Sequence, residues 1–330
     1  MAGYLVRRVI GMIILLFLLT VTVFFLFSLL PGDPARLTCG KACSPEIVES
    51  NRHRLGLDEP VLVQYQKFLT GIVAGRTFSP DSPDPIVCAA PCLGYSFFRR
   101  ETVGSLLARA APVTFWVAIG AFLLWMSFGV ILGIVAALSR GHWPDRFLMG
   151  LALVGYSFPT FFIGLLLIFF VILKLHWLPY PAFVEPWDNL PGFFQTMILP
   201  WITLAIFNLA YYIRLTRNQV LETFGEDYVR TARSKGLPER AVVVRHALRA
   251  GLTPIVTSAG IDLAYLLGGT VITENLYSLP GLGALALDSV TQSDLPVITG
   301  LTLVTASIII VANLVVDLLY TTIDPRVKLA

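Results

Sequence analysis

The feature that most constrains this chain is a set of long apolar runs without charge. Five runs contain no Asp, Glu, Lys or Arg: Val9–Leu30, Ala110–Leu138, Phe147–Leu173, Leu190–Ile213 and Leu295–Val316. Each exceeds the roughly 20 residues that an α-helix needs to cross a bilayer. A sixth run, Gly251–Thr273, is interrupted only by Asp262. The sequence therefore predicts an all-α membrane protein with six transmembrane helices.

The composition agrees with a membrane protein. The chain is 56% hydrophobic and only 14% charged, with a mean hydropathy of +0.75. A soluble domain is normally about one quarter charged. The formal net charge of +3 is too small to indicate nucleic acid as a partner.

The apolar runs also predict the domain organisation. Residues 1–30 form the first helix, which we expect to be retained, because its uncharged run is too long for a signal peptide and ends without a small-residue cleavage site. Residues 31–101 form a more polar region with one short amphipathic helix starting near Pro60. Residues 102–320 form a transmembrane domain with helices 2–6 and a loop at 214–253, and residues 321–330 form a tail.

The distribution of Lys and Arg predicts the orientation. The 214–249 segment carries eight basic residues, whereas the 277–294 segment carries none. Because basic loops stay on the cytoplasmic side, we expect both termini and the 214–253 loop to be cytoplasmic. Residues 31–101 are then extracytoplasmic.

The four cysteines all fall in this extracytoplasmic region, as the pairs Cys39/Cys43 and Cys88/Cys92. An oxidising compartment favours two disulfides, but their pairing is open. A four-thiolate zinc site has similar spacing, and the oxidising compartment argues against it. The sequence predicts no metal site.

Small residues recur four positions apart in two of the predicted helices. They are Gly129 and Gly133 in helix 2, and Gly260, Ala264 and Gly268 in helix 5. Such spacing lets helix backbones approach closely. It fits packing inside one bundle and equally a seam between two subunits.

The 214–253 loop has local signals of an ordered structure. Thr223 and Glu226 have capping-box spacing, and Phe224, Tyr228 and Ala232 form a narrow apolar stripe. Gly236 stands where a left-handed cap is needed, and a proline two residues later is well placed to begin another helix. An ordinary topology loop that rests on lipid headgroups needs none of these features. They favour a rigid element that docks into a partner.

A resemblance to a known family becomes specific in this loop. DYVRTARSKGLPERAVVVRHALRAGLTPIV resembles the cytoplasmic coupling-loop signature of binding-protein-dependent ABC importer permeases. The family motif Glu-Ala-Ala, three residues, then Gly, is matched by Arg230, Thr231, Ala232 and Gly236. The glutamate and first alanine are absent, which resembles the peptide/nickel branch.

Four further segments extend the resemblance over nearly the whole chain: RRVIGMIILLFLLTVTVFFLFSLLPGDPA, LGLDEPVLVQYQKFL, VITENLYSLPGLGALALDSVTQSDLPVITG and NLVVDLLYTTIDPRVK. The chain is most similar to the B-type permease subunit of dipeptide and oligopeptide importers. This implies a type I ABC importer permease fold in a bacterial cell membrane. The cysteine-containing insertion at residues 76–93 departs from the family pattern, in which a short Gly-Asp-Leu-Gly-like turn leads towards helix 2.

The resemblance also implies partners, because the sequence has no G-x-x-x-x-G-K-[ST] nucleotide motif. This chain would bind no cofactor and catalyse no reaction. ATP and Mg would be bound by two ABC ATPase subunits, while a second homologous permease and an extracytoplasmic binding protein would complete the importer. The residues that would couple to the ATPase are Glu226, Asp227, Tyr228, Arg230, Thr231, Ala232, Arg233, Lys235, Gly236 and Leu237.

Among these residues, Tyr228 and Ala232 would pack into a cleft of the ATPase, while the basic residues would meet its acidic rims. Gly236 would permit the turn.

Polar residues inside the predicted spans are candidates for the translocation path. They are Asn208, Tyr211, Tyr212, Asp262 and Glu274. Asp262 suits the amino terminus of a peptide, or alternatively bonds to a neighbouring helix or to the second permease. For Glu274, gating and structural roles are both open.

Other classes of function fit less well. His53, His142, His176 and His246 are dispersed, and no histidine shares a membrane layer with Ser157, which argues against intramembrane proteolysis. An ion channel would leave the ordered loop unexplained. The alternatives left are a permease for nickel or another small solute, and a membrane scaffold or receptor subunit without transport.

Overall fold

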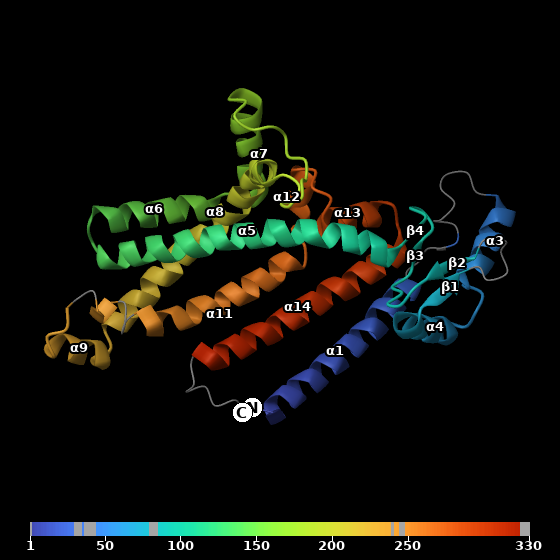
Figure 1. Cartoon of the computed structure of the whole chain (residues 1–330), viewed down its shortest axis with the longest axis horizontal. Helices are drawn as coiled ribbons and strands as arrows, with labels where there is room; N and C mark the ends of the chain where they lie inside the picture. The colour runs from blue at the N-terminus through green and yellow to red at the C-terminus, as the bar shows by residue number, and fades with distance from the viewer. Residues whose placement is uncertain are drawn as a thin grey trace. The chain divides into compact units, whose positions relative to one another are not determined.

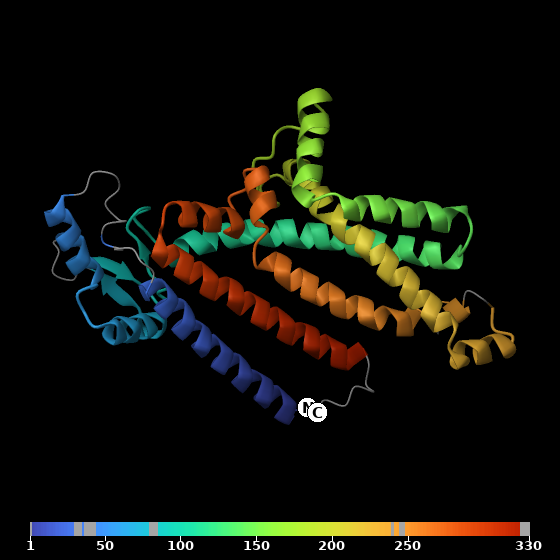
Figure 2. The same cartoon turned by 180° about the vertical axis from the view of Figure 1, so that it is seen from behind.

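The computed structural model describes residues 2–29, 35, 44–78, 85–238, 241–243 and 248–323. The chain forms two compact units. Unit 1 comprises Met1–Pro112 and Gly281–Ile310, and unit 2 comprises Val113–Pro280 and Val311–Ala330. Figures 1 and 2 show the helices and strands from two sides.

Unit 1 contains the following elements: α1 (Ala2–Leu29), α3 (Pro45–Leu55), α4 (Val61–Ala74), β1 (Arg76–Phe78), β2 (Ile86–Cys88), β3 (Tyr95–Ser96), β4 (Glu101–Thr102), the start of α5 (Val103–Leu138), α13 (Leu282–Thr291) and most of α14 (Leu295–Ile323). The helix α4 begins after Pro60, as predicted. A core of Val103, Leu107, Leu282 and Val297 joins α5, α13 and α14.

Two small antiparallel sheets add to the all-α prediction in this unit. In one sheet Arg76 pairs with Cys88, and in the other Tyr95 pairs with Thr102. Cys88 forms a disulfide with Cys92, so these two cysteines pair with each other. Cys39 and Cys43 lie outside the described residues, and their disulfide stays a prediction.

Unit 2 contains the rest of α5, α6 (Trp143–Ser157), α7 (Thr160–Leu167), the π-helical η1 (Ile168–Lys174), α8 (Leu190–Phe224), α9 (Asp227–Ser234), α11 (Leu248–Leu267), α12 (Val271–Leu276) and the end of α14. Its core includes Trp125 of α5, Met197 and Tyr212 of α8, and Ile255 of α11, all 0% exposed. Within this unit α9 lies at the end of α8 and α11 that is remote from α12 (Figure 1).

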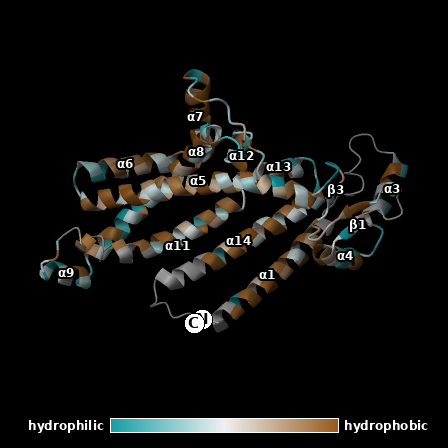
Figure 3. Cartoon of the chain, viewed as in Figure 1, coloured by the Kyte–Doolittle hydropathy of each residue, from teal (hydrophilic) through white to brown (hydrophobic). Residues whose placement is uncertain are grey.

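Among the described residues, four helices are long and apolar enough to cross a membrane: Val6–Leu26, Val103–Leu138, Leu190–Phe224 and Leu295–Val315. A bent pair, Trp143–Ser157 with Thr160–Lys174, makes a fifth candidate, and Pro254–Leu267 is a shorter apolar helix. Figure 3 shows predominantly hydrophobic colouring along α1 and α7.

Two of the predicted spans are interrupted. The expectation of one helix over Phe147–Leu173 is wrong, because α6 and the α7–η1 segment meet at 97°. Phe158 has extended backbone before Pro159, because a proline ring disfavours helical backbone at the residue that precedes it. Similarly, the run Gly251–Thr273 is not one helix, since α11 ends at Leu267 and Gly269 has a positive φ of 123°.

The small residues of helix 2 pack inside the bundle. A Cβ added at Gly129 would lie 2.7 Å from Cβ of Tyr212, and one at Gly133 would lie 2.5 Å from Cβ of Thr216. The two glycines therefore let the α5 backbone approach α8 closely. This supports the interpretation as packing within one chain.

Candidate coupling site

The ends of the basic loop are held together by the contact between α8 and α11. The helix α8 continues past the predicted end at Ile213 to Phe224. A Cβ added at Gly251 of α11 would lie 3.3 Å from Oγ1 of Thr223 and 3.4 Å from the carbonyl oxygen of Gln219. Glycine thus permits the two helices to meet where the loop leaves and re-enters the bundle.

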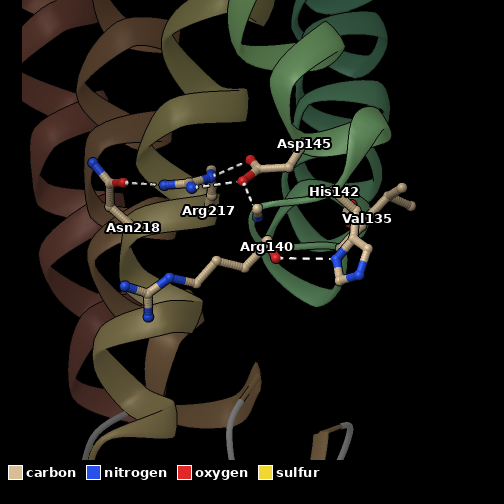
Figure 4. Close-up of polar contacts among 8 residues, drawn as sticks. Val135, Arg140, His142, Asp145, Arg217 and Asn218 are labelled. Atoms are coloured by element: carbon tan, nitrogen blue, oxygen red, sulfur yellow. Dashed lines mark hydrogen bonds and ion pairs between the residues drawn. The ribbon is translucent and has the colours of Figure 1, made fainter.

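A buried ion pair fixes the same end of α8 to α6 (Figure 4). Nε of Arg217 donates to Oδ1 of Asp145 at 2.6 Å, and Nη2 donates to Oδ2 at 2.8 Å. The amide of Gly141 also donates to Oδ2 at 2.9 Å. Only 4% of Asp145 is exposed. Such bidentate, charge-assisted bonding is strong and geometrically specific, so it sets the position of α8 relative to the α5–α6 turn.

Aromatic contacts reinforce this attachment of α8 to α6. The guanidinium of Arg214 lies 4.8 Å from the ring centroid of Tyr156. That ring stacks on Phe207 at 4.7 Å between centroids. The part of α8 from Phe207 to Arg217 is therefore anchored by charge and by stacking.

The start of α9 differs from the sequence prediction. Thr223 is inside α8, and its hydroxyl donates to the carbonyl of Gln219 at 2.8 Å. Glu226 occupies the N-cap without a side-chain capping bond. The predicted capping box is wrong because α8 extends through Thr223, and its hydroxyl bonds within that helix.

The end of α9 confirms the predicted turn. Gly236 has φ 73°. Its amide donates to the carbonyl of Arg233 at 2.9 Å, and the amide of Leu237 donates to the carbonyl of Ala232 at 3.4 Å. These two bonds are the Schellman motif, which needs a left-handed residue where this glycine stands. The carbonyl of Pro238 accepts from the next turn, at Ala241 and Val242.

One face of α9 is buried against its own chain. Val229 is 0% exposed and Ala232 is 5% exposed, and both pack with Phe224 and Val242. In this structure Ala232 packs against its own chain, and its predicted contact with a partner stays a prediction. Tyr228 leaves the predicted stripe and is 44% exposed. Val229, three residues before Ala232, is the apolar position that the stripe missed.

The other face of α9 is exposed and carries three basic and two acidic side chains. Nine of the ten predicted coupling residues are exposed: Glu226, Asp227, Tyr228, Arg230, Thr231, Arg233, Lys235, Gly236 and Leu237. The guanidinium of Arg233 lies 5.3 Å from the centroid of the Phe224 ring, so Arg233 also braces the helix. Arg230 is 3.7 Å from Asp227, an exposed pair that adds little stability.

Four of the predicted path residues lie close together on α8 and α11. The hydroxyl of Tyr212 donates to Oδ2 of Asp262 at 2.6 Å, and the Tyr211 ring meets the Tyr212 ring at 5.3 Å. Asn208 is one turn earlier and bonds the carbonyl of Leu204 at 3.4 Å. Asp262 thus bonds to a neighbouring helix, which was the second of its two interpretations.

Glu274 occupies a separate, buried position on α12. It is 0% exposed, and its Oε1 accepts from Thr114 at 2.7 Å and from Thr270 at 3.0 Å. These contacts tie α12 to α5. Its role in the translocation path stays a prediction.

Comparison with known proteins identifies the family. The family of binding-protein-dependent transport system inner membrane components matches residues 129–329, and the family of their N-terminal segments matches residues 1–118. The chain belongs to this family. These permeases are membrane subunits of ABC transporters that work with separate ATPase and substrate-binding subunits, so the chain is a non-catalytic, multi-pass permease.

Two relatives are similar over their whole length. One is a protein of Brucella abortus (strain 2308) that is named as a peptide transport system permease. It is 38% identical over 328 residues, which cover 99% of each chain. The glutathione transport system permease protein GsiC of Escherichia coli (strain K12) is 37% identical over 328 residues, again 99% of each chain.

A solved structure shares the fold. The permease fold of the methionine ABC transporter MetNI, in inward-facing conformations, superposes with a TM-score of 0.52 at 16% identity. The match covers 67% of this chain and 97% of that chain. The chain thus has the type I ABC permease fold that its sequence predicted.

Sequence reasoning missed the Asp145–Arg217 pair. The two residues are 72 positions apart, so no local pattern links them. One signal was present: Asp145 is the only acidic residue between two uncharged runs. A lone carboxylate at the edge of an apolar run needs a cationic partner.

Proposed function

We propose that this permease moves peptides into the cytoplasm, driven by ATP and Mg bound on two ATPase subunits. Its relatives are named for peptide and for glutathione transport, and glutathione is itself a short peptide. A second homologous permease completes the pathway as a heterodimer. Both termini and α9 are cytoplasmic, as the basic residues of the loop favour.

The observation that carries the coupling role is the construction of α9. The helix follows α8 directly, packs with Phe224 and Val242 on one face, and exposes Arg230, Arg233 and Lys235 on the other. A rigid, exposed helix suits docking into an ATPase cleft, where Tyr228 supplies an aromatic anchor. Arg230 and Lys235 favour an acidic rim, and such charges mainly set orientation and association rate.

A charge-reversal experiment tests the docking. The double variant Arg230→Glu/Lys235→Glu should insert into the membrane but recover much less ATPase subunit on purification, with a deficit that varies with salt. Arg146→Glu changes an exposed arginine at the start of α6 and is the matched control. Normal recovery of the ATPase by the double variant would contradict the docking surface.

A second experiment tests the cargo. The intact complex is reconstituted in liposomes with its binding protein, and uptake is measured for dipeptides, longer peptides and a nickel chelate. We expect ATP-dependent uptake of peptides. Uptake of the nickel chelate alone would assign the other branch of the family, and purification without any ATPase would favour a scaffold.

A further inference from the structure

The short helix α4 is attached to the part of α1 that crosses the membrane. The hydroxyls of Tyr65 and Thr20 are 2.9 Å apart. The Phe24 ring lies 5.3 Å from the Tyr65 ring and 5.6 Å from the Phe68 ring, between centroids. Both contacted residues of α1 fall inside the candidate span Val6–Leu26. Although α4 belongs to the region predicted to be extracytoplasmic, it therefore packs on a transmembrane segment.

These contacts fix the depth of α4. Phe24, which contacts Tyr65 and Phe68, precedes the end of α1 at Leu29 by five residues, which is about 8 Å along a helix at 1.5 Å per residue. Helices that lie in the membrane interface bury their apolar face by about 5–10 Å. The attachment of α4 thus agrees with the depth of an interfacial helix.

The surface of α4 divides into three sectors. Phe68 and Gly71 are buried against the protein. Next to the Tyr65 side lies a stripe of Leu62, Leu69 and Val73, spaced as i, i+7 and i+11, in which Leu62 is 71% and Val73 is 81% exposed. Beyond the stripe lies a mostly polar sector of the exposed residues Gln66, Lys67 and Thr70, which also includes Val63, 37% exposed. We call the apolar sector the α4 stripe.

The α4 stripe continues the lipid-facing surface of α1. Only 6% of the most apolar window of α1 is buried within the protein. Tyr65, which contacts α1, is next to the stripe on the helical wheel, so the stripe and the exposed face of α1 adjoin. Large exposed apolar side chains at this depth are stable against hydrocarbon, whereas they are costly against water.

We propose that α4 is an interfacial helix whose stripe of Leu62, Leu69 and Val73 inserts into the lipid acyl chains of the leaflet around the C-terminal end of α1. The polar sector with Lys67 and Thr70 faces water. The partner of this surface is lipid. Because the helix leads directly into β1, it holds the disulfide-bonded segment next to the membrane surface.

Photo-crosslinking from single positions tests the assignment. A genetically encoded benzophenone amino acid is placed at Leu62 or Val73 and, as the matched polar controls, at Lys67 or Thr70. Ile14 of α1, 52% exposed within the span, is the positive control for lipid contact. The complete complex with its binding protein is irradiated in nanodiscs of phosphatidylethanolamine and phosphatidylglycerol, and the adducts are identified by mass spectrometry.

We expect lipid adducts at Leu62 and Val73 at a level comparable to Ile14 and several-fold above Lys67 and Thr70. Cross-links from the stripe to the binding protein would overturn the proposal. It would equally be overturned by lipid adducts at Ile14 without any at the stripe, or by equal adducts at all four positions of α4.

Discussion

At the scale of single residues, the Asp145–Arg217 pair is the strongest polar contact around the coupling loop. Both carboxylate oxygens are bonded to the guanidinium, and the side chains of Asp145 and Arg217 are 6% and 20% exposed. Removing one partner of a buried ion pair lowers stability far more than removing one partner of an exposed ion pair, because the remaining charge is left without its partner. The pair therefore attaches α6 to α8.

Asp145→Asn should lower the stability of the purified permease by about 3 kcal/mol. This value is at the lower end of the range for breaking a buried ion pair, because Arg217 keeps some contact with solvent. The thermal midpoint in detergent measures this loss. Asp227→Asn removes a carboxylate that is 98% exposed and should leave the midpoint nearly unchanged. Equal midpoints for the two variants would contradict the role of the pair.

A second residue, Asp294, makes unit 1 sensitive to pH. Burial raises the pKa of Asp294, although the Ser96 hydroxyl, the Val297 amide and the Arg99 charge each lower it. The folded state then binds this proton more tightly than the unfolded state. The stability gained from this tighter proton binding is complete below the ordinary aspartate pKa of about 3.9. It is lost as the pH rises through the raised pKa of Asp294 in the folded state.

The Asp294→Asn side chain resembles the protonated acid and does not titrate. The thermal midpoint of this variant should therefore rise relative to that of the natural protein as the pH is raised from acid to neutral. Asp288→Asn removes a charge whose side chain is 57% exposed and controls for the loss of one carboxylate. A constant difference between Asp294→Asn and the natural protein at every pH would rule out this account.

At the scale of elements, the contact between α5 and α8 depends on absent side chains. A Cβ at Gly133 would also lie 2.9 Å from the carbonyl oxygen of Ile213, so Gly133→Ala must push the two helices apart. We expect a loss of about 1–3 kcal/mol, as for other overpacked sites, measured as a lower thermal midpoint. Gly150→Ala on α6, with nothing within 4 Å, should be neutral or slightly stabilising.

The elements also show what the sequence could predict. The turn after α9 depends on one left-handed residue, so a glycine in the right place was enough to predict it. The N-terminal end of α9 was mispredicted, because Thr223 bonds to Gln219 within α8 instead of capping the next helix. A hydroxyl has several local acceptors, and the length of the preceding helix decides which one it uses.

Longer-range features were beyond local patterns. The proline at position 159 indicated a break in the helix. The size of the bend, 97°, could not be predicted from the uncharged run alone. The pairing of Tyr212 with Asp262 and the burial of Glu274 depend on helices that are distant in sequence. Apolar runs thus predicted most helices, whereas the partners of their polar residues required the structure.

At the scale of the whole molecule, α8 connects the polar residues of the bundle to the coupling element. Along this one helix lie Tyr212, which bonds Asp262, then Arg217, which bonds Asp145, and finally the junction with α9. We propose that a movement of α9 reaches the predicted path through this helix. This transmission requires the turn at Gly236 to keep α9 in one orientation.

The most direct test compares Gly236→Val with Gly141→Val in reconstituted complexes. Both glycines have positive φ, 73° and 79°, and neither has an atom within 4 Å of an added Cβ. The backbone strain is thus matched, at about 1–2 kcal/mol or more for a branched side chain. Only Gly236 belongs to the coupling loop, whereas Gly141 lies in the α5–α6 turn and bonds Asp145 through its backbone amide, which valine also has.

The measurement is the amount of peptide taken up per ATP hydrolysed, in the presence of the binding protein. We predict that Gly236→Val assembles in the membrane but loses uptake per ATP several-fold, while Gly141→Val keeps the ratio of the natural protein. An unchanged ratio in Gly236→Val would contradict the assignment of α9 as the element that receives the work of ATP hydrolysis.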